Sequence, residues 1–163
     1  MAVVLVEGIT DRIALEAAAR LLGRDLAAEG VEVVPIGGAH AIARAAAGYR
    51  GDVVVGLCDA GEEGVFRDVL GDAVYVCDAN LEEELIRALG VERVEEVVAA
   101  QGDLETFRNF QNQPAWRGRT TTSQLVRWMH NGDRHHRYPP LLLAALDPTE
   151  IPVPLARALA AVA

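Results

Sequence analysis

The sequence predicts an α/β fold, in which a four-stranded parallel sheet is flanked by helices and followed by a C-terminal helical extension. Over residues 1–90, short β-branched runs alternate with segments that have helical periodicity. The runs are apolar on both faces, as is typical of parallel strands covered by helices on both sides. After Gly90 the strand signal stops, and the remaining segments favour helices.

The predicted strands are short runs rich in valine, each followed by a glycine, an acidic residue or both. They span residues 2–6, 31–36, 52–58 and 73–77. Helices are predicted where apolar residues recur at helical spacing or composition favours a helix, over residues 11–22, 39–47, 62–70, 81–89, 91–100, 103–110, 121–130, 139–146 and 154–162. We therefore expect residues 1–100 to form the α/β domain and residues 101–163 to form a helical tail packed on it.

Length and composition are those of a folded chain. It has 163 residues, of which 51% are hydrophobic, and this excludes an intrinsically disordered protein. No apolar run reaches the roughly 18 residues of a membrane span, and no secretory signal precedes the first strand. Cys58 and Cys77 form neither a disulfide framework nor a zinc motif. A cytoplasmic location without a membrane partner is the expectation.

The charged residues are unusual in type and in distribution. All 15 basic residues are arginines, which excludes lysine-dependent Walker-type nucleotidases and Schiff-base enzymes. The net charge is −9, but residues 1–100 carry −11, whereas residues 101–140 carry +3 together with three of the four histidines. This asymmetry is typical of a protein with a polyanionic partner or an acidic metal site.

Acidic residues follow three of the four predicted strands. Ligands of open parallel sheets bind outside the carboxyl ends of the strands, so these side chains should share one edge. The acids that follow the first, third and fourth strands include Glu7, Asp11, Asp59, Glu62, Glu63 and Glu82. For Asp11 and Glu62, stabilisation of a helix N-terminus is as good an explanation for an acidic residue as metal binding. Hard oxygen ligands at this density otherwise favour Mg²⁺ or Mn²⁺.

The same residues resemble a known domain. Glu7-Gly8-x-x-Asp11 after the first strand, the Gly37-Gly38 turn after the second and Asp59 after the third resemble the TOPRIM domain of primases, topoisomerases and nucleases. The motif that contains Glu82, and the tail segment 134–138, are similar to nucleases of the OLD (overcoming lysogenization defect) family. The resemblance covers nearly the whole chain and includes no ATPase part.

This resemblance implies a role for each matching residue. Glu7 and Asp11 would bind one metal ion, with Glu7 also serving in proton transfer, and Asp59 would lie between two ions. Glu82 would complete the second site, and His135 stands where OLD nucleases are expected to use a catalytic lysine. The resemblance therefore implies a phosphodiester hydrolase that uses two Mg²⁺ or Mn²⁺ ions and acts on nucleic acid, with DNA expected first.

Two departures from the family pattern support an alternative. The widespread pattern has a second aspartate where this chain has Gly61, so Glu62 or Glu63 would have to replace it, and the lysine is missing. The alternative is a catalytically weak or inactive TOPRIM-fold module that works with a separate ATPase subunit. A phospho-accepting receiver domain is disfavoured, because it needs a lysine and paired acids after the first strand.

The tail combines arginines with aromatic residues. Arg117, Arg119, Arg134 and Arg137 are candidates for contact with a nucleic acid, because guanidinium groups bind phosphates and aromatic rings stack on unpaired bases. Trp128 is interpreted mainly as a core residue because of its helical spacing from Leu125, whereas His130 is interpreted as a surface or cap residue.

Overall fold

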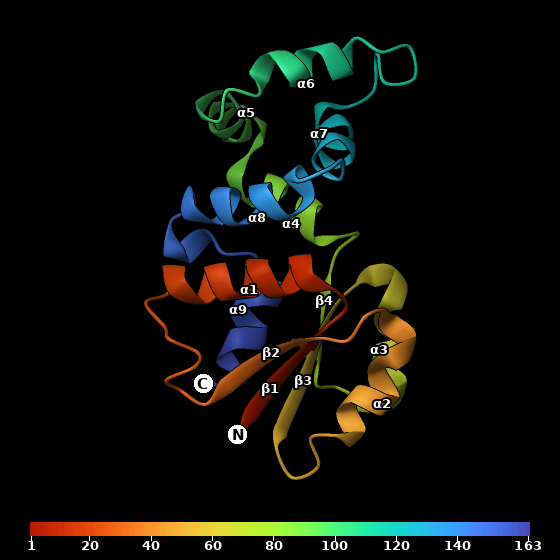
Figure 1. Cartoon of the computed structure of the whole chain (residues 1–163), viewed down its shortest axis with the longest axis vertical. Helices are drawn as coiled ribbons and strands as arrows, with labels where there is room; N and C mark the ends of the chain where they lie inside the picture. The colour runs from red at the N-terminus through yellow and green to blue at the C-terminus, as the bar shows by residue number, and fades with distance from the viewer.

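The computed structural model describes all residues, 1–163, and its centre is a parallel sheet (Figure 1). The strands are β1 (Ala2–Val6), β2 (Val31–Pro35), β3 (Val53–Asp59) and β4 (Val74–Cys77). Their order is β2-β1-β3-β4, and each neighbouring pair is parallel. The predicted fold class and the four predicted strands are confirmed, with boundaries that differ by one residue at most.

Helices cover both faces of the sheet (Figure 1). The helices α1 (Ile9–Leu21) and α9 (Val153–Ala160) lie on one face, whereas α2 (Ile42–Ala47) and α3 (Glu63–Leu70) lie on the other. Short 3₁₀ turns at Ala39–Ala41 and Ala60–Glu62 precede α2 and α3. Alternate residues of β1 face the two layers: Val4 and Val6 pack with α1, whereas Val3 and Leu5 pack with Phe66 of α3.

Five of the six helices that follow β4 form the upper part of the molecule, drawn in green to blue in Figure 1. They are α4 (Leu81–Leu89), α5 (Val91–Ala100), α6 (Leu104–Gln111), α7 (Thr121–Met129) and α8 (Arg134–Ala144). Trp128 lies at their centre, with ring centroids 5.2 Å from Phe107 and 5.4 Å from Tyr138. Helix α8 packs along α1, and a 3₁₀ turn at Pro148–Glu150 leads into α9. One buried cluster therefore runs from Val4 of the sheet to Val162.

Helix α8 begins earlier than the sequence predicts. The expected start was residue 139, but the helix begins at Arg134 and contains both Pro139 and Pro140. Proline lacks the N–H group that would bond to the carbonyl four residues earlier, so the helix loses two such bonds in its middle. Burial of Tyr138 and Leu142 offsets that loss. As a result, His135 and His136 lie in the first turn of a helix that packs against α1.

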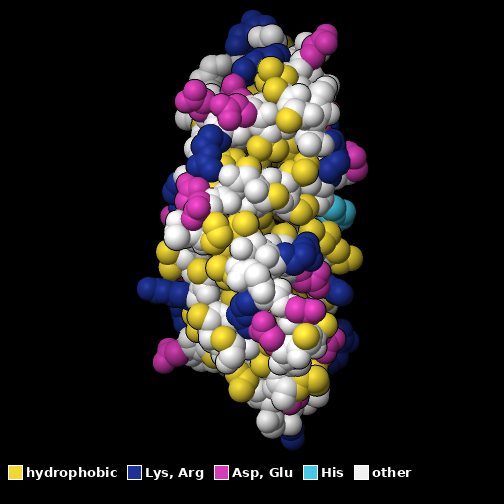
Figure 2. All heavy atoms as spheres, turned by 90° about the vertical axis from the view of Figure 1, so that its left-hand side faces the viewer, with side chains coloured by type: hydrophobic (Ala, Val, Ile, Leu, Met, Phe, Trp, Pro, Cys, Tyr) yellow, Lys and Arg dark blue, Asp and Glu magenta, His cyan; other side chains and the backbone are white.

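The surface does not keep the charge separation of the sequence. On the face shown in Figure 2, basic and acidic side chains are interspersed. Several arginines of the helical region pair with acids from other elements: Arg93 lies 2.9 Å from Glu150, and Arg108 lies 2.7 Å from Glu95. No helix in the structure combines the length and the apolar character that a membrane crossing requires.

Candidate functional site

Three carboxylates meet at the carboxyl edge of the sheet. Val6 of β1 pairs with Leu57 of β3, so Glu7 and Asp59 leave neighbouring central strands almost side by side. Asp11 projects from the first turn of α1 toward them. They line a cleft of about 510 Å³ whose walls are Glu7, Gly8, Ile9, Thr10, Asp11, Gly37, Gly38, Asp59, Glu82, His130, His135 and His136. This is the sheet edge at which ligands of open α/β folds bind.

Backbone hydrogen bonds hold the cleft in shape. The N–H groups of Gly37 and Gly38 both donate to the backbone carbonyl of Glu7, at 3.1 and 3.2 Å. Their φ angles are 77° and 116°, which only glycine adopts without strain. The N–H of Gly8 donates to Asp11 Oδ2 at 3.0 Å. Asp11 is therefore a capping residue of α1 that also faces the cleft, and its two alternative roles are compatible.

The carboxylates of the cleft repel one another, and no positive charge nearby balances them. Burial, with further repulsion from Asp11, Glu82 and Glu7, raises the pKa of Asp59 to about 7. Burial also raises the pKa of Asp11 to about 6, with added repulsion from Glu82 and Glu7. The pKa of Glu7 is raised by burial and by Glu62. A divalent cation between these groups would relieve the repulsion, so the residues present fit a metal ion.

Histidines from the tail close the other side of the cleft. His130 at the end of α7 and His135 in α8 both approach the buried carboxylate of Glu82 in α4. One ligand atom from each of the three lies within 4.8 Å of the other two. Burial lowers the pKa of His135, against the opposing effect of Glu82. Neutral imidazole is the form that binds metals.

Sequence reasoning missed part of this arrangement. The role of His130 as the C-cap residue of α7 matches its interpretation as a cap, but its side chain also lines the cleft. Thr10 was not singled out, yet its Oγ1 lies 2.8 Å from Nδ1 of His136. Three histidines close together in a chain with only four were the available signal. Their convergence depends on how α7 and α8 pack against α4 and α1.

Two acids proposed as ligands lie outside the walls of the cleft. The 3₁₀ turn after β3 carries Glu62 near enough to Glu7 to raise its pKa, but Glu62 does not line the cleft. Glu63 accepts a hydrogen bond from Arg67 Nε at 2.6 Å, one helical turn along α3. Metal binding by Glu62 and Glu63 stays a prediction.

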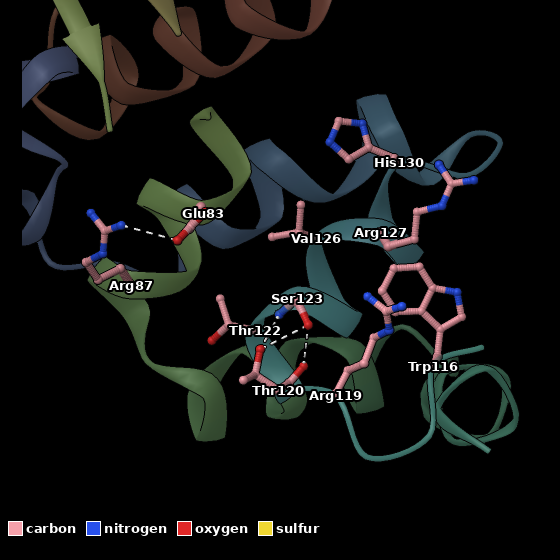
Figure 3. Close-up of a pocket in the computed structure, with 10 residues that line it drawn as sticks. All are labelled: Glu83, Arg87, Trp116, Arg119, Thr120, Thr122, Ser123, Val126, Arg127 and His130. Atoms are coloured by element: carbon pink, nitrogen blue, oxygen red, sulfur yellow. Dashed lines mark hydrogen bonds and ion pairs between the residues drawn. The ribbon is translucent and has the colours of Figure 1, made fainter. Parts of the chain in front are cut away.

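A second hollow adjoins the cleft and shares His130 with it (Figure 3). It has a volume of about 630 Å³ and lies between α4, α7 and the loop before α7. Its walls carry three arginines together with hydroxyl groups and one indole ring: Glu83, Arg87, Trp116, Arg119, Thr120, Thr122, Ser123, Val126, Arg127 and His130. We call this hollow the arginine groove, and its donors suit an anionic ligand.

The loop that carries part of the groove is held by buried amide groups. Gln124 of α7 is 4% exposed and donates from Nε2 to the carbonyl of Trp116 at 2.8 Å. The side-chain oxygen of Gln124 accepts a hydrogen bond from the amide of Gln111. The Trp116 ring stacks on Phe110. The guanidinium of Arg119 lies 4.9 Å from the centroid of the Trp116 ring. Trp116 thus holds Arg119 at the wall of the groove.

The four tail arginines differ in their surroundings. Arg119 lines the arginine groove, whereas Arg117 donates to the carbonyl of Asn112 outside it. Arg134 lies over the Trp128 ring and donates to a backbone carbonyl. Arg137 pairs with Asp103 and Asp133. Arg127, which is exposed on α7, also lines the groove.

Comparison with known proteins agrees with the fold and the motif. Residues 1–50 match the family model described as "Overcoming lysogenization defect protein-like, TOPRIM domain". The first 50 residues of the chain are therefore similar to a TOPRIM domain of the OLD type. The matched residues include part of the motif on which the sequence resemblance was based, namely β1, Glu7, Asp11 and the Gly37-Gly38 turn. Asp59, Glu82 and segment 134–138 lie outside the match. The suspected resemblance to the OLD family is therefore confirmed over residues 1–50. No curated protein matches the chain.

Solved structures show the same fold over almost the whole chain. The C-terminal region of the Burkholderia pseudomallei OLD protein superimposes with a TM-score of 0.73 and 16% identity, covering 99% of this chain and 96% of that one. The C-terminal region of the Xanthomonas campestris pv. campestris OLD protein gives a TM-score of 0.67 and 18% identity, covering 99% and 93%. The helices after the TOPRIM sheet thus have the arrangement found in these OLD proteins.

Proposed function

We propose that this TOPRIM domain is a divalent-metal-dependent nuclease that cleaves phosphodiester bonds of DNA. The observation that carries the proposal is the meeting of Glu7, Asp11 and Asp59 at one edge of the sheet, with Asp11 and Asp59 raised in pKa by burial and by their neighbours. Such a set of oxygen ligands suits Mg²⁺ or Mn²⁺. Two ions in the cleft would activate water and stabilise the leaving oxygen.

The chain's own residues would hold and orient the substrate. Glu7 lies where it can accept a proton, since the two glycine N–H groups fix its backbone while its side chain faces the cleft. Asp59 lines the same cleft as Glu7, Asp11 and Glu82, whose charges raise its pKa, and it would help to hold the ions. His135 stands near Glu82, where it can donate a hydrogen bond to a phosphate oxygen.

The arginine groove supports a nucleic-acid substrate. It opens beside the metal-binding cleft, and His130 belongs to both. Figure 3 shows the side chains of Arg119 and Arg127 on the same side of the groove, near Trp116. A phosphodiester strand lying in this groove would place its neighbouring phosphate at the cleft, with guanidinium groups neutralising its charge. Arg117, Arg134 and Arg137 would contribute where the strand extends along the tail.

Plasmid cleavage tests the proposal. The full chain is incubated with supercoiled plasmid and Mg²⁺ or Mn²⁺, beside the variants Glu7→Gln and Asp59→Asn. Asp68→Asn is the matched control, because Asp68 is exposed on α3 away from the cleft. We expect cleavage by the wild type and the control, and loss of at least about 100-fold in the other two.

The opposite outcome has a clear meaning. If the wild type cleaves with neither ion, the nuclease assignment is wrong, and the alternative of an inactive module that works with a separate ATPase subunit takes its place. Cleavage that persists in Glu7→Gln and Asp59→Asn would instead indicate a contaminating nuclease. RNA of matched length, tested in parallel, decides the substrate class.

A further inference from the structure

We propose that Glu82, His130 and His135 form a separate binding site for a borderline transition-metal dication of the Zn²⁺ and Co²⁺ class, next to the carboxylate site. The three residues come from α4, from the end of α7 and from α8. The inference deepens the proposed function and rests on it for the role of the ion, whereas binding itself is measured without nucleic acid.

The separations of the ligand atoms fit a shared ion better than direct contact. Glu82 Oε2 lies 3.6 Å from His130 Nε2, and Glu82 Oε1 lies 3.8 Å from His135 Nδ1. Charge-assisted hydrogen bonds are shorter, at about 2.7–2.9 Å. Two atoms that each lie about 2.1 Å from one tetrahedral ion are about 3.4 Å apart. Small side-chain adjustments would bring all three ligand atoms onto one ion.

Unpartnered polar atoms point independently to a ligand. His135 Nδ1 is buried and has no hydrogen-bond partner. The Glu82 side chain is 8% exposed and accepts no hydrogen bond within the chain, and its two oxygens lie near His130 and His135. A buried nitrogen without a hydrogen-bond partner destabilises the folded chain. An ion bound between Glu82 and His135 would satisfy both.

The donor set selects the class of metal. Two imidazoles and one carboxylate are the ligands of many catalytic zinc sites, which keep a further position open for water or substrate. Mg²⁺ prefers oxygen ligands and loses its water reluctantly, so this site should discriminate against it. The neighbouring His136 does not belong to this group of close ligand atoms, and its Nδ1 contacts Thr10. All three proposed ligands line the cleft that also contains Asp59 and Asp11.

Spectroscopy of Co²⁺ tests the site without an activity assay. The metal-free full chain is titrated with Co²⁺, whose visible absorption reports nitrogen ligation, and then with Zn²⁺ or Mg²⁺ as competitor. The variants are His130→Ala, His135→Ala and Glu82→Gln, and circular dichroism verifies that each is folded. His40→Ala is the control, since His40 is exposed and lies outside the cleft.

The expected result is one Co²⁺ with visible absorption per chain, displaced by Zn²⁺ and not by a large excess of Mg²⁺. Each histidine variant should bind at least about tenfold more weakly, and the control should match the wild type. An absent Co²⁺ spectrum, an unchanged spectrum in both histidine variants, or displacement by equimolar Mg²⁺ would overturn the proposal. Plasmid cleavage without this spectrum, or the spectrum without cleavage, shows which of the two proposals fails.

Discussion

Thr10 in the first turn of α1 and His136 in the first turn of α8 are joined by a side-chain contact of 2.8 Å. Thr10 is 6% exposed and directly precedes Asp11. The contact therefore ties the tail to the helix that carries one of the proposed metal ligands.

A double-mutant cycle measures this contact. Thr10→Val and His136→Gln should each destabilise the chain, and their coupling free energy should be about 1 kcal/mol, as for a net hydrogen bond. Urea unfolding of the four proteins gives the value. Coupling within a few tenths of a kcal/mol of zero would show that the two groups act independently.

Asp103 makes the stability of the helical region depend on pH. The Tyr138 hydroxyl donates to its Oδ2 at 2.6 Å and Arg137 donates at 2.9 Å, and these bonds hold the pKa of Asp103 below its ordinary value. Because the pKa of Asp103 is lower in the folded state, its ionised form stabilises the fold. This contribution is fully present above the pKa of aspartate in the unfolded chain, near 3.9, and is lost as the pH falls through the pKa of Asp103 in the folded chain. Tyr138→Phe should therefore cost about 1 kcal/mol at pH 6 and less below pH 4.

Thermal unfolding from pH 3 to pH 7 checks this expectation, with Tyr49→Phe as the control. Tyr49 is partly buried, and its hydroxyl makes no side-chain hydrogen bond. A constant difference between Tyr138→Phe and the wild type at every pH would contradict the expected role of the Asp103 charge.

The metal-free cleft should be destabilising at neutral pH. Because the pKa of Asp59 is raised to about 7, its ionisation disfavours the folded state as pH rises from its unfolded pKa, near 4, to above 7. Asp59→Asn should stabilise the chelator-treated protein at pH 8 by about 2 kcal/mol and have little effect at pH 4. Unfolding in EDTA measures the gain, and equal stability of the variant and the wild type at pH 8 would refute it.

A glycine in β3 allows α3 to approach the sheet closely. A Cβ atom at Gly56 would lie 2.7 Å from Phe66 Cδ1 and 2.9 Å from Leu70 Cδ1. Gly56→Ala should therefore destabilise the chain by about 1–3 kcal/mol. Gly64→Ala is the matched control in α3, where a Cβ meets no atom within 4 Å, and it should stabilise by up to about 1 kcal/mol. Equal unfolding midpoints for the two variants would contradict the packing argument.

The arginine groove predicts a particular salt dependence. Replacing Arg119 and Arg127 by glutamine should weaken binding of duplex DNA and lower the slope of log K against log salt by about 2, roughly one per phosphate contact. Arg117→Gln tests an arginine of the same loop that lies outside the groove. Fluorescence anisotropy at several salt concentrations provides both slopes. If the double variant keeps the wild-type slope, phosphates do not bind in the groove.

The local sequence pattern was sufficient to predict the sheet and the acidic residues at its edge. The valine-rich runs predicted all four strands, because apolarity on both faces is a property of each segment alone. Glu7 and Asp59 could then be placed together, since parallel strands bring their carboxyl ends to one edge. The start of α8 could not be predicted in this way, because the two prolines argue locally against a helix that the burial of Tyr138 stabilises.

The sequence by itself determined the α/β fold, the acidic edge and the relationship to the OLD-type TOPRIM domain. Only the tertiary structure decided that His130 and His135 meet at Glu82, and that Arg119 and Arg127 line one groove. The physical reason lies in the range of the interactions. Strand pairing and helix periodicity are set by neighbouring residues, whereas the contacts between α4, α7 and α8 depend on how amphipathic helices pack around a shared core.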